Sequence, residues 1–263
     1  MKPKKYALIT GASMGIGYEL AKQHAAHGDN VVLVARSAEK LKALASDLEK
    51  NYGIKALVLA KDLSKENVAQ EIYDDLKNQG IIIEYLINNA GFGEFGMFYE
   101  TDWAKEKQMI DLNITTLTHF CKLFLPDMIE RRSGRIMNLG STASFQPGPT
   151  MAVYFATKAF VLHFSEAIAN EVADKGVTVT ALCPGATESG FQAAANLAES
   201  KLIKGKKLPT SAEVAAYGYK AMMQGKAVAI HGFMNYLVAN SVRFSPRSWV
   251  VRLVRFMQDK AGE

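Results

Sequence analysis

The 263-residue sequence has few of the residues that form crosslinks or metal sites, with only two cysteines and five histidines. Cys121 and Cys183 lie far apart in apolar stretches, which indicates buried free thiols rather than a disulfide or a thiolate metal site. The histidines are scattered, and the closest pair, His24 and His27, lacks acidic or thiol companions. We therefore predict no metal centre and expect the chain in a reducing compartment, the cytoplasm.

Long apolar runs are also missing. No uncharged apolar stretch approaches the ~18 residues that a membrane-spanning helix needs. The apolar run that follows the basic start ends at Thr10, too soon for the apolar region of a secretory signal. Although the formal net charge is +5, no helix-turn-helix, zinc or aromatic RNA signature accompanies it, so nucleic acid is not an expected partner.

Short apolar runs alternate instead with amphipathic stretches of helical period. The runs predict strands at Tyr6–Ile9, Val31–Ala35, Ala56–Ala60, Ile81–Asn88, Arg135–Leu139, Val177–Cys183 and Ala227–Ile230. This alternation predicts an α/β fold with a single doubly wound, Rossmann-like parallel sheet and helices on both faces. We assign residues 1–232 to this domain, with a substrate lid at about 186–210, and residues 233–263 to a C-terminal helical tail.

A glycine-rich turn follows the first strand and precedes a helix. It reads Thr10-Gly11-Ala12-Ser13-Met14-Gly15-Ile16-Gly17, with the spacing Gly-x-x-x-Gly-x-Gly. Glycines let the backbone approach a pyrophosphate closely, and the helix N-terminus offers unpaired N–H groups and the positive end of its dipole. The strand, turn and helix together predict a phosphate-binding unit.

Tyr154 and Lys158 stand four residues apart, so on a helix they share one face and the ammonium can lie beside the phenol. A nearby cation favours the phenolate and makes a tyrosine usable as an acid or base near neutral pH. Such a pair suits carbonyl reduction. The same spacing also occurs on ordinary solvated helix faces, so the surrounding motifs decide between the two interpretations.

The glycine turn, the segment Asn88-Asn89-Ala90-Gly91 and the Tyr154/Lys158 pair resemble, in order and separation, the short-chain dehydrogenase/reductase family. The resemblance covers about residues 5–232, and the stretches Phe92–Gly96 and Gly140–Phe145 look like a bacterial subgroup of poorly assigned NADP-dependent oxidoreductases. It implies a Rossmann-like fold and transfer of hydride between a nicotinamide cofactor and a carbonyl or alcohol.

The resemblance also implies residue roles. Tyr154 is the expected proton donor, Lys158 polarises it and holds the nicotinamide ribose, and Ser141 bonds the substrate oxygen, with Ser144 as the alternative serine. Asn113 matches an asparagine that helps to hold a relay water, although a helix-interior asparagine with a local bond is an open alternative. The expected cofactor-binding residues are Gly11, Ser13, Met14, Gly15, Ile16, Gly17, Arg36, Ser37, Asp62, Leu63, Asn89, Ala90, Gly91, Tyr154, Lys158, Pro184, Gly185, Thr187 and Ser189.

Cofactor choice is expected at the end of the second strand, where a carboxylate would bond the ribose of NAD. The chain has Arg36 there, whose planar fork suits a 2′-phosphate, and Ser37 adds a hydroxyl. NADP is therefore favoured over NAD. The alternative is that Arg36 is a solvated loop charge, and Met14 stands where related NADP enzymes often carry a second basic residue. Asp62 resembles an adenine contact and is also a suitable helix N-cap.

Five phenylalanines near the motifs suggest an apolar pocket, namely Phe92, Phe95, Phe145, Phe155 and Phe191. Core packing explains many of them equally well, and we expect Phe155 to point away from the site because it follows Tyr154 by about 100° on a helix. The leading interpretation is an NADP-dependent reductase of small hydrophobic ketones or aldehydes.

Two other functions remain open. A 3-oxoacyl thioester reductase would attract an acidic carrier protein through the net charge and a lysine cluster, Lys201, Lys204, Lys206 and Lys207. A non-catalytic NADP sensor is disfavoured because a full set of reactive residues serves no purpose in a sensor.

A homodimer or homotetramer is the expected assembly, through the helix from about Ala152 to Val172 and the long one near Trp103 to Ile129. In the tail, Pro246 starts a predicted helix with an apolar arc and a basic arc, formed by Trp249, Val250, Leu253, Val254, Phe256 and Met257 and by Arg247, Arg252 and Arg255. Docking on protein is the favoured role of this tail, and contact with an anionic membrane surface is the less favoured alternative.

Overall fold

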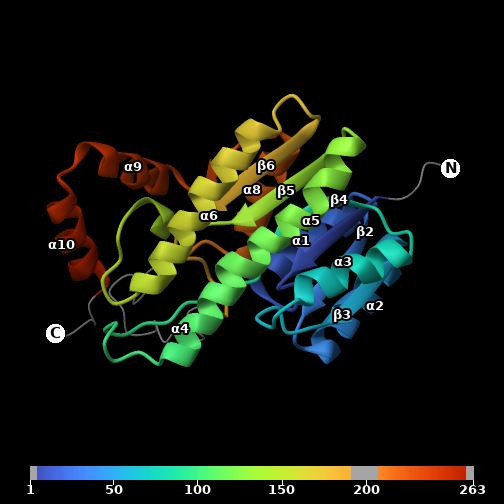
Figure 1. Cartoon of the computed structure of the whole chain (residues 1–263), viewed down its shortest axis with the longest axis horizontal. Helices are drawn as coiled ribbons and strands as arrows, with labels where there is room; N and C mark the ends of the chain where they lie inside the picture. Colours follow the sequence, from blue (N-terminus) through green and yellow to red (C-terminus); the bar gives the residue numbers. More distant parts are fainter. Residues whose placement is uncertain (1–4, 191–206, 259–263) are drawn as a thin grey trace.

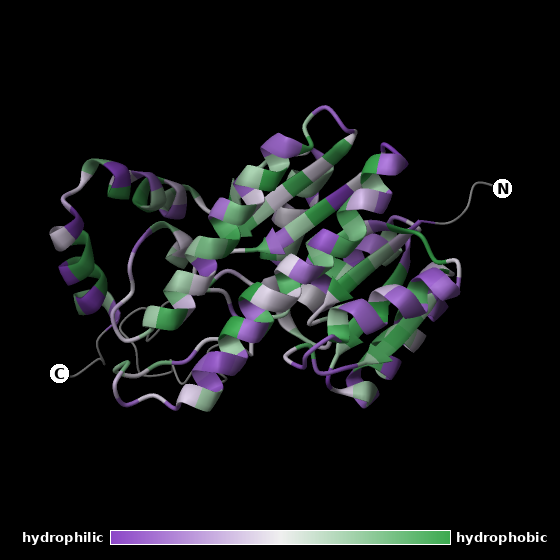
Figure 2. Ribbon diagram, viewed as in Figure 1, coloured by the Kyte–Doolittle hydropathy of each residue, from purple (hydrophilic) through white to green (hydrophobic). Residues whose placement is uncertain are grey.

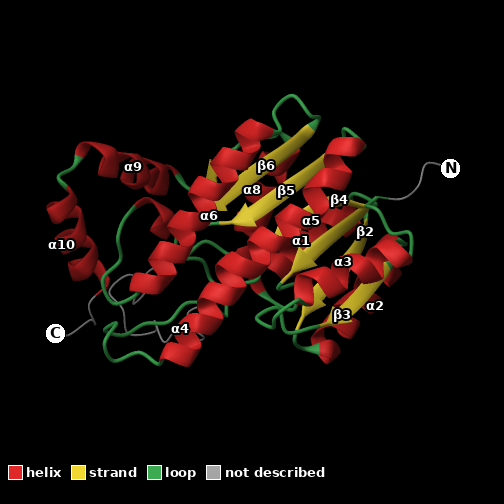
Figure 3. Cartoon of the chain, in the orientation of Figure 1, coloured by secondary structure: helices red, strands yellow, loops and turns green. Residues whose placement is uncertain are grey.

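The described residues form one parallel sheet of seven strands in the order β3-β2-β1-β4-β5-β6-β7 (Figure 3). The computed structural model describes residues 5–190 and 207–258. The strands are β1 (Tyr6–Thr10), β2 (Asn30–Ala35), β3 (Ala56–Ala60), β4 (Ile83–Asn88), β5 (Gly134–Leu139), β6 (Val177–Cys183) and β7 (Val228–Ile230). Every strand predicted from the sequence is present, and the Rossmann-like α/β fold is confirmed.

Helices cover both faces of this sheet (Figure 1). One face packs against α1 (Gly15–Ala26), α2 (Ala38–Tyr52) and α8 (Ser211–Met223). The other face packs against α3 (Val68–Asn78), α5 (Leu117–Glu130) and α6 (Ala152–Glu171). In β1, Ala7 and Ile9 belong to the first core and Leu8 to the second, so both faces of the strand are buried. Double burial explains why the strands are mostly apolar, and they are largely green in Figure 2.

The strand order reverses beside β1. From β1 the chain builds outward through β2 and β3, and it then returns so that β4 pairs with the other edge of β1. In open parallel sheets of this kind, ligands bind outside the carboxyl ends of the strands at such a reversal. The fold therefore directs attention to the loops that follow β1 and β4.

The helix predicted near Trp103 to Ile129 is continuous but irregular. It comprises α4 (Trp103–Ile110), a π-helical segment (Asp111–Thr116) and α5. Asp102 caps its start, since its carboxylate accepts a hydrogen bond from the Ala104 N–H at 3.3 Å. The wider π turn contains Asn113, and π segments inside α-helices are frequent at functional sites.

The C-terminal part of the chain forms α9 (Phe233–Ser241), a 3-10 turn (Val242–Phe244) and α10 (Arg247–Gln258), which project at one end of the molecule (Figure 1). Val250 and Val254 of α10 are buried in a cluster with Met109, Met151 and Phe155 of the main body. No helix among the described residues is both long and apolar enough to cross a membrane. Most of the lid predicted at 186–210 lies outside the described residues, which end at 190 and resume at 207.

Candidate active site

A cleft of about 970 Å³ opens at the carboxyl ends of the strands. Its walls come from the β1–α1 turn, the ends of β2 to β6, the N-terminal part of α6, and both α9 and α10. All the predicted catalytic and cofactor-binding residues line this cleft, except Gly17, Asn113 and the alternative serine Ser144. Segments separated by more than a hundred residues in the sequence therefore meet in one cavity.

The glycine turn has the geometry that its sequence predicts. Gly11 and Gly15 have positive φ values of 68° and 61°, which side chains rarely tolerate. A Cβ on Gly17 would lie only 2.4 Å from the Asn89 amide nitrogen and 2.5 Å from the Gly11 carbonyl oxygen. Gly17 thus lies beneath the turn and permits close packing there, while Gly11 and Gly15 lie at the cleft.

Asn89 connects the glycine turn to the end of β4. Its side-chain amide donates to the carbonyl oxygen of Thr10 at 2.9 Å, and the Thr10 hydroxyl accepts hydrogen bonds from the backbone N–H groups of Asn89 and Ala90, each at 2.9 Å. These bonds join the two loops on either side of the strand reversal. The floor of the cleft is therefore held by the β1–β4 pair.

Basic and hydroxyl side chains gather at the end of β2. Arg36, Ser37 and Lys40 all line the cleft, and Arg36 and Lys40 are exposed. Asp62 lies close enough to Arg36 to feel its charge. Burial raises the pKa of Asp62, but hydrogen bonds from the Ser64 hydroxyl and N–H and the nearby Arg36 outweigh it, so the pKa is below its usual value. The sequence argument missed Lys40, although its place on the first turn of α2 puts it within reach of Arg36.

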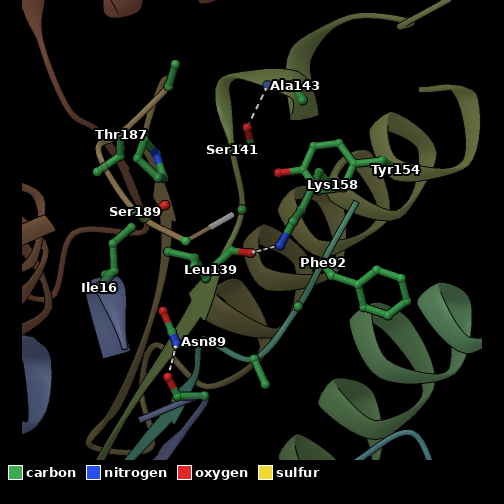
Figure 4. A pocket seen from close by; sticks show the side chains of 18 of the residues that line it. Ile16, Asn89, Phe92, Leu139, Ser141, Ala143, Tyr154, Lys158, Thr187 and Ser189 are labelled. Atoms are coloured by element: carbon green, nitrogen blue, oxygen red, sulfur yellow. Dashed lines mark hydrogen bonds between the residues drawn. The ribbon is translucent and has the colours of Figure 1, made fainter. Parts of the chain in front are cut away.

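Ser141, Tyr154 and Lys158 share the opposite wall, with the phenol oxygen of Tyr154 directed toward Ser141 (Figure 4). Ser141 begins a 3-10 turn (Thr142–Phe145), and its hydroxyl accepts from the Ala143 N–H at 3.1 Å. The Thr142 N–H donates to the Pro184 carbonyl at 2.9 Å, which ties this turn to the end of β6. Ser144 is buried away from the cleft and its hydroxyl accepts from the Ser141 N–H, so Ser141 is the serine that faces the cavity.

The Lys158 ammonium lies beside the Tyr154 ring and is bonded to the end of β5. It donates to the Leu139 carbonyl at 2.7 Å and stands 5.8 Å from the centre of the Tyr154 ring. Burial raises the pKa of Tyr154 to about 12, and the hydrogen bond with Ser141 lowers it only partly. Burial lowers the pKa of Lys158 to about 8. Burial therefore leaves Tyr154 a neutral acid in this cleft, and the effect of Lys158 on the phenol stays a prediction.

Asn113 lies behind this wall rather than in it. Its amide donates to the Phe92 carbonyl at 3.0 Å and to the Thr157 hydroxyl at 3.1 Å, and its oxygen accepts from the Phe92 N–H at 3.2 Å. A Cβ on Gly91 would meet the Asn113 oxygen at 2.9 Å and the Lys158 nitrogen at 3.5 Å. Asn113 therefore joins the β4 loop to α6, and its side-chain oxygen and the Lys158 nitrogen both lie close to Gly91.

The C-terminal helices contribute a wall of the cleft, which is one of the two places, with a neighbouring subunit, that the sequence suggested for the tail. Met234, Asn235, Val238, Val254 and Met257 line the cleft, as does the buried Gln258. A Cβ on Gly185 would approach the Asn235 amide to 2.6 Å, so the Pro184-Gly185 turn and α9 touch closely. The amphipathic pattern of the tail was the available signal, but it could not show which partner the apolar side covers.

The five phenylalanines predicted near the pocket lie in different places. Phe92 and Phe155 line the cleft, whereas Phe95 packs beside it and Phe145 packs against Leu162 and Cys183. Phe191 lies outside the described residues. The prediction that Phe155 points away is wrong, because the first turns of α6 extend beyond the sheet and are enclosed on several sides, and Phe155 packs with Met109, Val250 and Val254.

Comparison with known proteins agrees with this geometry. The model of the short chain dehydrogenase family matches residues 5–200. In a mouse 17-beta-hydroxysteroid dehydrogenase type 3, 184 aligned residues are 36% identical and cover 68% of this chain and 59% of the mouse protein. A human very-long-chain 3-oxoacyl-CoA reductase is 34% identical over 186 residues, covering 68% and 58%. The chain belongs to the short-chain dehydrogenase family.

Solved structures extend the likeness over nearly the whole chain. A short-chain dehydrogenase from Sphingobium yanoikuyae in complex with NADPH is 30% identical, covers 91% of this chain and 94% of its own, and gives a TM-score of 0.82. A bulky-bulky ketone specific alcohol dehydrogenase from Comamonas testosteroni is 29% identical, with coverage of 91% and 92% and a TM-score of 0.78. By contrast, the aligned part spans less than two thirds of the length of the curated relatives.

Proposed function

We propose that this protein is an NADP-dependent oxidoreductase that reduces the carbonyl group of a bulky hydrophobic ketone, or oxidises the corresponding alcohol. One observation carries the proposal. A single cleft holds a neutral buried phenol beside a serine hydroxyl at one wall, and two basic side chains beside a glycine turn at another. The wall with the basic side chains suits a nucleotide cofactor, and the wall with the phenol suits a second molecule. Their presence in one cleft is explained if both molecules bind there together.

The residues present fit NADP. The close approach that Gly17 permits and the positive φ values of Gly11 and Gly15 leave room for a pyrophosphate at the start of α1. Arg36 and Lys40 supply two positive charges where a 2′-phosphate has to be held, and Ser37 supplies a hydroxyl. Structures of similar proteins contain NADPH. Lys40 replaces, from α2, the second basic residue that is missing at Met14.

Bound NADPH supplies the hydride in reduction. The chain supplies the rest. Ser141 donates a hydrogen bond to the substrate oxygen as negative charge develops on it, and Tyr154 gives that oxygen its proton. A phenol with a pKa raised to about 12 is protonated at neutral pH, so it is ready to act as the acid of the reductive direction. Lys158 places a buried positive charge beside this pair, and Asn113 holds the loop behind it.

The substrate class follows from the wall formed by α9 and α10. Met234, Val238, Val254 and Met257 present flexible or branched apolar side chains to the cleft, and methionine adapts well to irregular ligands. Relatives named for a hydroxysteroid, a very-long-chain 3-oxoacyl-CoA and bulky-bulky ketones support a large lipophilic substrate.

A 3-oxoacyl thioester reductase is the second candidate, favoured by the very-long-chain 3-oxoacyl-CoA reductases among the relatives. The experiment is NADPH oxidation measured with a steroid ketone, a diaryl ketone, a long-chain 3-oxoacyl-CoA, a carrier-bound 3-oxoacyl chain and acetone. We expect turnover with the bulky free ketones and little with acetone. Preference for either thioester would replace the first candidate by the second. Absence of NADPH oxidation with every ketone and thioester, and of NADP reduction with the corresponding alcohols, would contradict both.

A further inference from the structure

The C-terminal helices expose an unusual number of apolar side chains. Of the nineteen large hydrophobic side chains exposed among the described residues, eleven lie between Phe233 and Met257. The most exposed are Phe244 at 89%, Phe233 at 74%, Trp249 at 69%, Met234 at 68% and Phe256 at 65%. A short terminal segment therefore carries most of the exposed apolar surface, and large exposed patches mark interaction sites. We call α9, the turn Val242–Phe244 and α10 together the C-terminal face.

The rotation of α10 explains this exposure. Its buried residues Val250, Val254 and Gln258 follow one another at four-residue intervals, and the two valines anchor the helix on the cluster of Met109, Met151 and Phe155. Trp249, Leu253 and Phe256 fall within about 60° of one another on the other part of the apolar arc. They are 69%, 59% and 65% exposed. One edge of α10 therefore packs against the main body, and a second, apolar edge is left exposed.

The positive charge of the C-terminal face indicates what kind of partner binds at this exposed edge of α10. Residues 233–258 contain Arg243, Arg247, Arg252 and Arg255 and no aspartate or glutamate. Arg243, Arg247 and Arg252 are exposed. A second copy docked here about a two-fold axis would place the same arginines against one another without a carboxylate to pair with them. An anionic lipid bilayer supplies the opposite charge, and tryptophan and phenylalanine beside arginine suit the boundary between headgroups and acyl chains.

We propose that the C-terminal face binds the surface of an anionic bilayer, with Trp249, Leu253 and Phe256 inserted at the level of the headgroups. Met234, Val238 and Met257 both line the cleft and are exposed, so the mouth of the cleft lies among the same helices. Bound in this way, the protein holds the mouth of its cleft beside the lipid. The inference concerns where the protein binds and is independent of which carbonyl compound it reduces.

Flotation of the full-length protein with vesicles tests the proposal. We expect the protein to float with equimolar phosphatidylcholine and phosphatidylglycerol and to remain below vesicles of phosphatidylcholine alone. Trp249→Ser/Leu253→Ser/Phe256→Ser removes the inserted side chains and should weaken binding by more than about tenfold. Arg247→Glu/Arg252→Glu reverses two charges and should weaken it by at least about tenfold. None of these five residues lines the cleft.

Matched controls lie on the opposite end of the molecule (Figure 1). Tyr52→Ser/Ile82→Ser removes two exposed apolar side chains there, and Lys42→Glu/Lys50→Glu changes the net charge as much as the double arginine variant. Both controls should float like the parent. Absence of flotation by the parent, or equal flotation of the triple serine variant, overturns the proposal. A lower mass of that variant in light scattering, without flotation of the parent, would assign the face to a second copy instead. NADPH binding measured in parallel verifies that each variant is folded.

Discussion

Burial acts in opposite directions on the two ionisable side chains that share a wall of the cleft. It raises the pKa of Tyr154 to about 12 and lowers that of Lys158 to about 8, because each group loses the water that stabilises its charged form. The phenol therefore stays protonated throughout the working range of an enzyme. The ammonium is the group whose charge changes near physiological pH.

This difference predicts a pH profile. The value of kcat/KM for NADPH reports ionisations of the free enzyme. A lysine with its pKa lowered to about 8 is charged below that pH and loses its charge above it, so we expect kcat/KM for reduction to fall above pH about 8 with one apparent pKa. The midpoint temperature of thermal unfolding, measured on the same samples, should not fall over this pH range. A profile that stays level to pH ~10, the ordinary pKa of a lysine, would contradict a functional role for the Lys158 charge.

Cofactor preference is a second property of single residues. Arg36→Asp replaces a cation by a carboxylate that repels a phosphate and can bond a ribose hydroxyl, so the Kd for NADPH should rise by about 10- to 100-fold, as expected for loss of a charge-assisted hydrogen bond. The Kd for NADH should stay level or fall. Lys40→Ala should raise the NADPH value by a smaller factor, and Lys42→Asp, on the same helix outside the cleft, should change neither. An unchanged ratio of the two constants in Arg36→Asp would place the 2′-phosphate elsewhere.

At the scale of elements, a buried polar network joins the two central strands to α6. The Asn88 amide of β4 donates to the Asn138 oxygen of β5, and the Asn138 amide donates to the Ser165 hydroxyl of α6, both at 2.9 Å. All three residues are buried. Because α6 carries Tyr154 and Lys158, the network fixes the helix that presents them to the cleft.

Removal of the central member tests this role. Asn138→Ala leaves the buried Asn88 amide without its Asn138 acceptor and should lower the free energy of unfolding by about 1–3 kcal/mol. Lys42→Ala, at an exposed position of α2 away from this network, should stay within about 0.5 kcal/mol of the parent. Denaturant unfolding followed by circular dichroism measures both. Equal stability of the two variants would mean that packing alone positions α6.

Elements with a strong local signal could be predicted from the sequence, and those defined by distant contacts could not. Strands buried on both faces are mostly apolar, so β1 to β7 were visible in the sequence, and the glycine turn and Arg36 follow from local geometry. The π turn at Asn113 depends on how the long helix crosses α6, and the side of α10 that is buried depends on Met109 and Met151. Neither of these contacts produces a periodic pattern in the sequence.

For the whole molecule, the outer surface of α6 supports the expected assembly. Ala156, Phe160, His163, Ala167 and Asn170 form one exposed stripe along this helix. Phe160 is 39% exposed and stacks on Phe164 with the ring centres 5.8 Å apart. Phe160 and the two alanines give this stripe an apolar centre, which suits a two-fold contact with a second copy, at least a homodimer.

A charge placed in the stripe tests the dimer. We expect the parent to be a dimer or tetramer at micromolar concentration in light scattering, and Phe160→Arg to reduce the mass, because a two-fold axis would bring two arginines together. Tyr52→Arg, at a similarly exposed position on α2, should leave the mass unchanged. A monomeric parent, or a variant with the parent's mass, would rule out this stripe as the interface.

The central claim is that the cleft reduces a carbonyl group with NADPH through Tyr154, and single-turnover reduction by Tyr154→Phe tests it most directly. The substitution keeps the ring and removes only the proton donor. We expect NADPH to bind with a Kd within about threefold of the parent, while the rate of NADPH oxidation falls by at least about 100-fold. Oxidation within about tenfold of the parent rate, with NADPH bound equally well, would contradict the account.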